Sequence, residues 1–459
     1  MQPRYWILCG LFALLLARPV HADPAASEKS PLHYIWATAY HIPPETTTEE
    51  SGYFSLCEGR NGKIYIGCAA YGRDSYLVEF DRAMRIVLDT HKLVGLPLTP
   101  TGYAAQSKIH TRNFVGPSGK IYVGTKQGYP NTAERAALKR GEKIPLYKGG
   151  YVITFDPATG TAVNLGMPMP WGDPRLGAGE TEGQGVIDVA ADESRGLIYV
   201  ITCEDQHWML YDSHHPDQGF RELQPALALK DQPNTLIDKQ GRATAITSEY
   251  KVARYDPATD KVTIDDLLVD GKPMRAVLPK EVVHPDWRLA ADGATAYLQT
   301  LNDSRMFQID LSGKTGQPVP AKDLGNRIEG KRPDSRGSIA IAPDGRVYSS
   351  VRINNETGFG GLPPPLGSLR SDRRQDGRLG RLRGQEPGLL RLQSAAGEKP
   401  RRQRPANPRL PHAPRRHAYA AARDHGNHRR ARRQRLCDDH LPLHPAPNRQ
   451  GAVEMTNDE

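Results

Sequence analysis

The chain has 459 residues, a formal net charge of +9 at pH 7 and 38% hydrophobic residues. This composition indicates a globular protein with a sizeable core and excludes a collagen-like or wholly disordered chain. The charge is uneven. Residues 362–459 hold 21 Lys and Arg against 10 Asp and Glu, a net charge of +11, so the rest of the chain carries −2.

Residues 1–22 have the features of a secretory signal peptide. Arg4 supplies the positive start, an apolar run covers 5–17, and Val20-His21-Ala22 is a small-residue cleavage site. The run is too short to span a bilayer, and no later segment is longer and equally apolar. We therefore expect a secreted or periplasmic protein without a membrane span, with its mature start near Asp23.

A repeated pattern runs through the globular part: a turn with Gly, then a β-rich run. It reads NGKIYIG (61–67), SGKIYVG (118–124), RGLIYVI (195–201), QGRATAI (240–246), DGATAYL (292–298) and DGRVYSS (344–350). Five of these runs are followed by a second strand ending in Asp, as in YVITFDPATG (151–160) and KVARYDPATD (251–260). Gly tolerates positive φ and Pro pre-sets φ, so both patterns favour tight turns between strands.

The repeat spacing predicts an all-β β-propeller. We expect the Gly turn to join the first and second strands of each blade, and the Asp turn to join the third and fourth. A two-sheet sandwich is the alternative, and six repeats disfavour it. One helix is expected over 131–143, capped by Asn131 with Glu134 three residues on, as an insertion between the second and third strands of blade two.

The repeat breaks near residue 361. Residues 362–459 contain no Phe and no Ile and are rich in Arg, Pro and Gly. Such a segment buries too little apolar surface to offset its ordering entropy. We predict about five and a half blades over residues 23–361, followed by a disordered basic tail over 362–459.

A shifted reading frame would explain the break. Read one base later, residues 362–377 can become YLHHLVRYDPTAGKM, which restores the missing sixth Asp turn. Residues 432–450 can become DGNVYVTTIYPFTLLRID, which is a seventh Gly-turn strand. We therefore predict that the parent chain has seven blades; the alternative is a genuine basic tail that binds anions or surfaces. In an exported chain the Arg-rich run 425–445 does not point to nucleic acid as a partner.

Two polar segments could carry chemistry. In SKIHTRNFVG (107–116), His110 and Arg112 share one strand face, with Asn113 beside them; Arg112 could grip a carboxylate and His110 could act as a base or metal ligand. In TCEDQHWMLYD (202–212) the candidate residues are Glu204, Asp205, His207 and Trp208. The plainer alternatives are a histidine bonded to a neighbouring loop and a polar hairpin with Trp208 in the core.

Other loops at the same presumed face add polar residues, namely Glu249, Tyr250, Asn302, Asp303, Asn354 and Glu356. We expect these residues to contact a ligand. The cofactor stays open; a divalent metal held by His110, His207 and Glu204 is the candidate. No nucleotide-binding loop, zinc-protease motif, nucleophile elbow or haem-attachment motif is present. Cys57 and Cys68 could pair, or both could be free thiols.

The blades NGKIYIG…FD and SGKIYVG…FDPATG resemble the seven-bladed β-propeller superfamily of WD-, NHL- and quinoprotein-like repeats. The resemblance covers residues 31–361 and implies the fold, because propellers host many functions. A more distant likeness, to oligogalacturonate-lyase-type propellers, would map His110, Arg112 and His207 to a metal- and substrate-binding face.

Three functions follow as hypotheses. The first is an exported propeller that binds a polar ligand, such as a glycan, at one face of the ring. The second is a metal-assisted polysaccharide lyase or hydrolase, in which His110 or His207 is the base and Arg112 binds the substrate carboxylate. The third is a protein-interaction scaffold without catalysis. The sequence specifies neither the ligand nor the oligomeric state.

Overall fold

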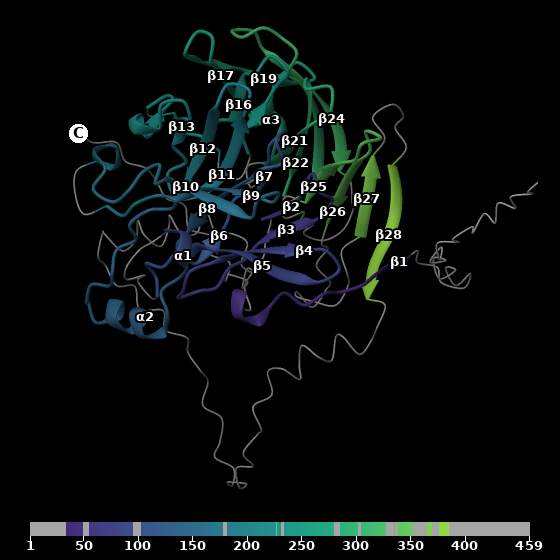
Figure 1. Cartoon of the computed structure of the whole chain (residues 1–459). Helices are drawn as coiled ribbons and strands as arrows, with labels where there is room; N and C mark the ends of the chain where they lie inside the picture. The colour runs from purple at the N-terminus through teal and green to yellow at the C-terminus, as the bar shows by residue number, and fades with distance from the viewer. Residues whose placement is uncertain are drawn as a thin grey trace, which may run out of the picture.

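The computed structural model describes residues 34–48, 55–94, 102–177, 181–225, 227–230, 234–279, 285–301, 304–326, 335, 338–351, 365–369 and 376–384. The predicted signal peptide lies outside these residues, as does the basic segment beyond 384. Within the described part, the strands form six sheets that follow one another along the chain (Figure 1).

The first three sheets come from the N-terminal half. Sheet 1 contains β2 (Leu56–Glu58), β3 (Ile64–Gly67), β4 (Tyr76–Phe80) and β5 (Met84–Asp89). Sheet 2 contains β6 (Lys108–Ile109), β7 (Phe114–Val115), β8 (Ile121–Lys126), β9 (Val152–Asp156) and β10 (Thr161–Gly166). Sheet 3 contains β11 (Gly185–Asp192), β12 (Leu197–Cys203), β13 (Trp208–Asp212) and β14 (Phe220–Glu222).

The other three sheets follow. Sheet 4 contains β15 (Leu236–Ile237), β16 (Ala243–Ile246), β17 (Val252–Asp256) and β18 (Lys261–Asp265). Sheet 5 contains β21 (Pro285–Leu289), β22 (Thr295–Thr300), β23 (Arg305–Asp310) and β24 (Val319–Asn326), extended by β19 (Leu267–Val269) and β20 (Lys272–Pro273). Sheet 6 contains β25 (Ile339–Ile341), β26 (Val347–Ser350), β27 (Pro365–Leu369), β28 (Asp376–Gly384) and β1 (Tyr34–Ala37).

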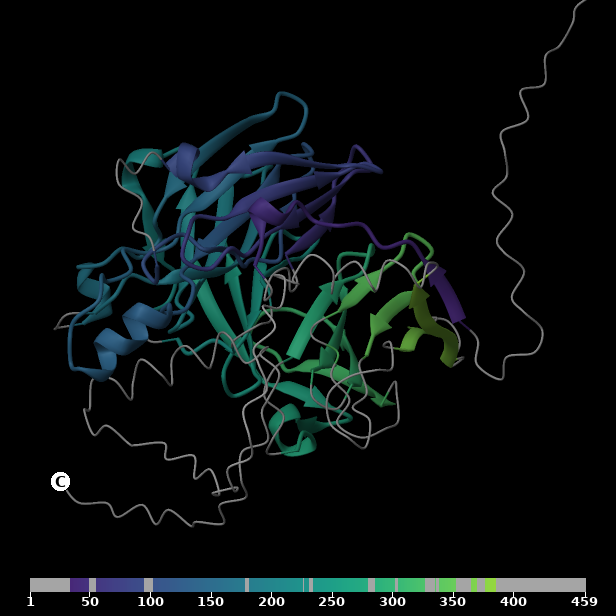
Figure 2. The ribbon, with the colours of Figure 1, turned by 90° about the horizontal axis from the view of Figure 1, so that it is seen from below.

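The sheets lie around a common centre. The inner strands of successive sheets are in contact: β2 with β7, β7 with β11, β11 with β15, β15 with β21, and β21 with β25. Figure 2 shows the same order as colours that run around the molecule. Serial sheets of four to six strands, mostly antiparallel and with adjoining inner strands, make a β-propeller, which confirms the predicted fold class.

The turn chemistry matches the prediction. Each of the six glycines in the repeat lies between an inner strand and the next strand of its sheet (β7 and β8 in sheet 2), at positive φ from 64° to 90°. In sheet 2, Gly160 N–H donates to the Asp156 carbonyl at 2.8 Å, which closes the turn between β9 and β10. The repeated sequence therefore encodes two hairpins per blade.

The sixth sheet differs from the sequence expectation of half a blade. β25 and β26 come from the predicted propeller region, but β27 and β28 lie beyond residue 361. β28 also pairs in parallel with β1, so the beginning of the described chain joins the last sheet (Figure 2). Strand structure thus continues past the boundary where the composition changes.

Helices are few among the described residues. They are α1 (Thr90–Val94), α2 (Thr132–Lys139), α3 (Met274–Val277) and the 3-10 turns η1 (Pro44–Thr46), η2 (Pro174–Leu176) and η3 (Pro216–Gln218). In α2 the Asn131 side chain accepts from the Glu134 N–H, and the Glu134 side chain accepts from the Asn131 N–H. This capping box and the position of α2 between β8 and β9 confirm the predicted helical insertion.

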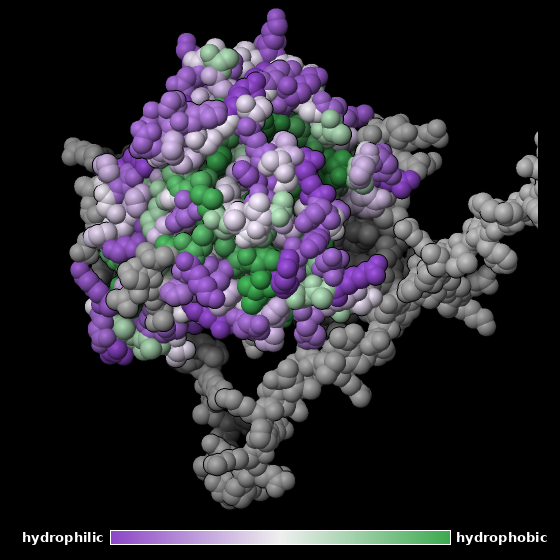
Figure 3. All heavy atoms as spheres, in the orientation of Figure 1, coloured by the Kyte–Doolittle hydropathy of each residue, from purple (hydrophilic) through white to green (hydrophobic). Residues whose placement is uncertain are grey.

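The hydrophobic core lies between neighbouring sheets. Tyr65 and Leu77 of sheet 1 pack with Ile121 of sheet 2, and Trp287 of sheet 5 packs with Val252 of sheet 4. Figure 3 shows polar side chains over most of one face, with apolar side chains gathered towards its middle. Packing between sheets therefore fixes the inner strands, and these strands position the site described next.

Candidate functional site in the central channel

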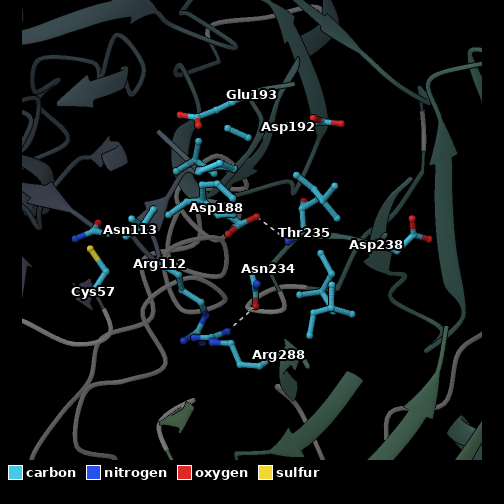
Figure 4. Close-up of a pocket in the computed structure, with 18 of the residues that line it drawn as sticks. Cys57, Arg112, Asn113, Asp188, Asp192, Glu193, Asn234, Thr235, Asp238 and Arg288 are labelled. Carbon is cyan, nitrogen blue, oxygen red and sulfur yellow. Dashed lines mark hydrogen bonds between the residues drawn. The ribbon is translucent and has the colours of Figure 1, made fainter. Parts of the chain in front are cut away.

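A cavity of about 640 Å³ lies among the inner strands. Its wall combines apolar side chains with a small number of charged and amide groups (Figure 4). The polar lining residues used below are Arg112, Asn113, Asp188, Asn234, Thr235 and Arg288. Asp188 and Arg288 lie on the inner strands of sheets 3 and 5, and the other four residues lie just before the inner strands β7 and β15 of sheets 2 and 4, so four blades contribute to the site.

Two arginines converge on one carboxylate. Arg112, before β7, forms an ion pair with Asp286 of β21, with 3.2 Å between Nε and Oδ1. Arg288, two residues along β21, donates from Nη1 to the same Oδ1 at 3.0 Å. Asp286 is fully buried and Arg112 is 7% exposed. Both guanidinium groups are therefore held in place beside the cavity by a shared acidic partner.

Amide groups complete the arrangement around the arginines. Arg288 Nη1 also donates to Asn234 Oδ1 at 2.8 Å, a bond drawn in Figure 4. Asn234 is fixed in turn, because its carbonyl accepts from the Trp287 indole N–H at 2.5 Å. Within the described part of the chain, Asn113 Nδ2 and Asp286 Oδ2 are buried and lack hydrogen-bond partners. Unsatisfied buried polar atoms are costly, which is a common mark of a functional site.

Asp188 is the second acid of the cluster. It lies on β11 at an irregularity in the pairing with β12, between Val186 and Asp188. A bulge of this kind changes the direction of a side chain. Asp188 lines the cavity, and its Oδ2 accepts from the Thr235 N–H at 2.7 Å (Figure 4).

Burial dominates the electrostatics. Desolvation raises the pKa of Asp188 to about 7, against the opposing effects of the Thr235 N–H and Arg112. Desolvation also raises the pKa of Asp286. It lowers the pKa of Arg112 to about 10, which leaves the guanidinium charged at neutral pH. The cluster therefore becomes more positive when Asp188 takes up a proton.

Three other acids line the cavity close to the Gly turns, and each is bonded to a neighbouring side chain. Asp192 accepts from Arg195 at 2.6 Å, and Asp238 accepts from Arg242 at 2.6 Å. Glu193 accepts from the Ser118 hydroxyl at 2.6 Å. Asp192 and Asp238 are therefore neutralised by their own arginines, and Glu193 is held by neutral donors at the turn.

The structure brings two of the predicted site residues into the cavity, Arg112 and Asn113. His110 is buried, and its backbone N–H donates to the Gly124 carbonyl at 3.2 Å. β6 ends at Ile109 and β7 begins at Phe114, so the predicted strand alternation does not run through this segment. This break explains why Arg112 lines the cavity and His110 does not.

The second predicted segment lies elsewhere. His207 Nδ1 and Glu222 Oε1 of β14 are 2.6 Å apart, and Glu204 faces sheet 2, with Oε1 3.7 Å from Lys126 Nζ. Trp208 is 1% exposed and packs in the core between sheets 3 and 4, so its ring is not available to a sugar. Asp205 is exposed and bonded to Gln184.

The predicted metal site is not assembled. No group of three or more His, Cys, Asp or Glu side chains suited to a metal ion occurs in the described part of the chain. His110, His207 and Glu204 therefore do not fit a metal centre together, because each is engaged in a different packing environment.

The loop residues predicted to contact a ligand are not gathered at the cavity within the described part of the chain. Tyr250 is 2% exposed and belongs to the core between sheets 4 and 5, whereas Glu249 is exposed. Asn302, Asp303, Asn354 and Glu356 lie outside the described residues.

Cys57 and Cys68 are free thiols, and burial raises the pKa of Cys57 to about 12 and that of Cys68 to about 11. The described residues include no helix that is long and apolar enough to cross a membrane.

Sequence reasoning missed Asp188, Asn234, Asp286 and Arg288. A usable signal exists in PDWRL (285–289), where an Asp and an Arg alternate on an innermost strand just before a Gly turn. In GVIDVAAD (185–192), Asp188 interrupts an otherwise apolar run in the middle of the strand, and Asp192 ends it. An isolated charge in such a run indicates either a channel position or a buried pair.

No family model and no curated protein matches the sequence. Among solved structures, the chain is similar to the β-propeller domain of Cps50 (Swd1) from Myceliophthora thermophila, with 13% identity over 72% of this chain and 86% of that one, TM-score 0.42. It is also similar to the periplasmic gluconolactonase PpgL of Pseudomonas aeruginosa, with 14% identity over 71% and 83%, TM-score 0.43. A third is a Lactobacillus plantarum protein, with 15% identity over 70% and 82%, TM-score 0.41.

Proposed function

We propose that this β-propeller binds a small polar ligand bearing a carboxylate or a similar oxyanion in the channel cavity. The observation that carries the proposal is the convergence of Arg112 and Arg288 on one buried carboxylate oxygen beside that cavity. Guanidinium groups recognise planar oxyanions through paired N–H donors, and their attraction for an anion is stronger in a partly desolvated cavity.

The cavity wall supports a ligand of sugar-acid size. Its volume of about 640 Å³ falls within the range of small-molecule sites. Leu56, Phe114 and Leu289 supply apolar surface, and Asn113 and Asn234 supply amide groups that can bond hydroxyls. A ring with hydroxyls and one carboxylate, such as a uronic acid, matches both kinds of wall. The export signal predicted for residues 1–22 would place this ligand in the periplasm or outside the cell.

Titration calorimetry with galacturonate and with neutral galactose at about pH 6 tests the proposal. We expect saturable binding of the acid and at least tenfold weaker binding of galactose, since the two sugars differ in the anionic group. Arg288→Gln should weaken galacturonate binding at least tenfold, because the loss of a charge-assisted hydrogen bond costs about 1.5–3 kcal/mol.

Arg195→Gln is the matched control. Arg195 lines the cavity at the turn side, is half-exposed and pairs with Asp192. This variant should bind like the wild type. Equal affinity for the two sugars, or binding that is insensitive to Arg288→Gln in a folded variant, would refute the assignment of the arginines.

A further inference from the structure

Asp188 faces the same cavity as the arginine pair, and this proximity has a consequence for any anion that enters. We infer that the ligand's oxyanion is bound together with one proton, and that Asp188 holds this proton. The inference rests on the proposed function and deepens it. It makes the protein a binder of an oxyanion plus a proton and gives Asp188 a direct role in recognition.

Geometry selects Asp188 for this role. The residue is 3% exposed, lines the cavity and accepts a hydrogen bond at Oδ2 from the Thr235 N–H. In the close-up, Asp188 points from β11 into the space above Arg112 and Arg288 (Figure 4). A ligand oxyanion held by the two arginines therefore approaches the Asp188 carboxyl.

A carboxylate and an oxyanion repel each other in a partly desolvated cavity. A protonated carboxyl instead donates an O–H⋯O⁻ bond, one of the strongest hydrogen bonds between side-chain groups. Solvent supplies the proton, and no other bond forms or breaks. The raised pKa of Asp188, about 7 through burial, keeps the cost of protonation small near neutral pH.

The charged groups around Asp188 are consistent with this role. Arg112 approaches it from sheet 2 and Arg288 from sheet 5, and both favour the carboxylate form. Asp286 lies behind them and ion-pairs with both. Sheet 4 contributes the neutral Asn234 and Thr235, and sheet 1 contributes the Cys57 thiol, which stays protonated at neutral pH. At the end of its own strand, Asp192 and the following Glu193 have lowered pKa values and are bonded at the turn.

Asp286 is the competing site for the proton, since burial raises its pKa as well. Its Oδ1 lies 3.2 Å from Arg112 Nε and 3.0 Å from Arg288 Nη1. Two guanidinium contacts favour its charged form, whereas the direct partner of Asp188 is the neutral Thr235. The geometry therefore points to Asp188, and the experiment separates the two acids.

Calorimetry of the full chain with galacturonate, in two buffers of different ionisation enthalpy, measures the protons taken up per ligand. We expect uptake close to zero at about pH 5.5, where Asp188 is already protonated, and close to one at about pH 8. The affinity should fall about tenfold for each pH unit above about 7. Asp188→Asn, a mimic of the protonated acid, should show no uptake, and its affinity should not change with pH.

Asp192→Asn is the matched control, because Asp192 lines the cavity on the same strand and has a lowered pKa. Its proton uptake should equal that of the wild type. Uptake that persists in Asp188→Asn, or wild-type binding without uptake at about pH 8, would overturn the inference. Absence of binding at about pH 5.5 would instead overturn the proposed function, so the two failures are distinguishable.

Discussion

Arg112 and Asp286 form a buried ion pair between sheets 2 and 5, which are not neighbours in the ring. The pair therefore spans the channel instead of stitching adjacent blades together. Burying two charges costs desolvation energy, and a purely structural contact could be made more cheaply by apolar side chains. A charged pair across the channel fits a site that presents guanidinium groups to a ligand.

Removing one member of this pair should be strongly destabilising. Asp286→Asn leaves Arg112 and Arg288 close to each other without their shared carboxylate, so we expect a loss of about 3–5 kcal/mol in the free energy of unfolding. Urea denaturation measures this loss. Asp266→Asn breaks the exposed pair with Lys251 and should cost less than about 1 kcal/mol. Similar costs for the two variants would contradict the account.

Asp188 should also make stability depend on pH. Its pKa of about 7 in the folded protein exceeds the usual value of 3.8, so between these values the folded state holds a proton that the unfolded state releases. The free energy of unfolding should therefore fall as the pH rises from about 4 to about 7, by an amount on the order of a few kcal/mol, and stay level above that range.

The comparison with Asp188→Asn isolates this effect. The asparagine cannot titrate, so the stability of the variant relative to the wild type should increase from about pH 5 to about pH 8. Acids with lowered pKa values, such as Asp173 and Asp192, act in the opposite sense and at lower pH. A difference between wild type and variant that is independent of pH would show that Asp188 is ionised in the folded protein.

The repeated Gly turns can be tested at Gly62. Its φ is +75°, and an added Cβ would meet no atom within 4 Å, so substitution tests backbone strain alone. Gly62→Ala should cost about 1 kcal/mol of unfolding free energy. Gly313→Ala is the control, because it also has open space and lacks a positive φ. If thermal melts showed the same loss of stability for Gly62→Ala and Gly313→Ala, positive φ at Gly62 would not be the cause.

The predicted frame change near residue 361 is a separate matter for the gene. Sequencing around codons 358–364 should reveal an inserted or deleted base, and restoring the frame should return the Asp turn and the seventh Gly-turn strand. An intact reading frame in the source genome would contradict this prediction and leave the basic segment as a genuine feature.

The sequence was sufficient for the fold because the blade signal is local. Gly119 and Asp156 each close a hairpin by their own turn chemistry, and these hairpins repeat along the chain. The site was predicted only in part, since it depends on the ring. Arg112 was recognisable as a charged residue in SKIHTRNFVG (107–116), just before an inner strand, but its partner Asp286 belongs to a distant blade. The bulge that directs Asp188 into the cavity has no separate sequence signature.

The most direct test is a crystal structure of the full chain soaked with galacturonate at about pH 6. We expect the ligand in the channel cavity, with its carboxylate contacting Arg112 and Arg288 and with Asp188 within hydrogen-bond distance. Galacturonate bound at another face, or a cavity that stays free of ligand at saturating concentration, would contradict it.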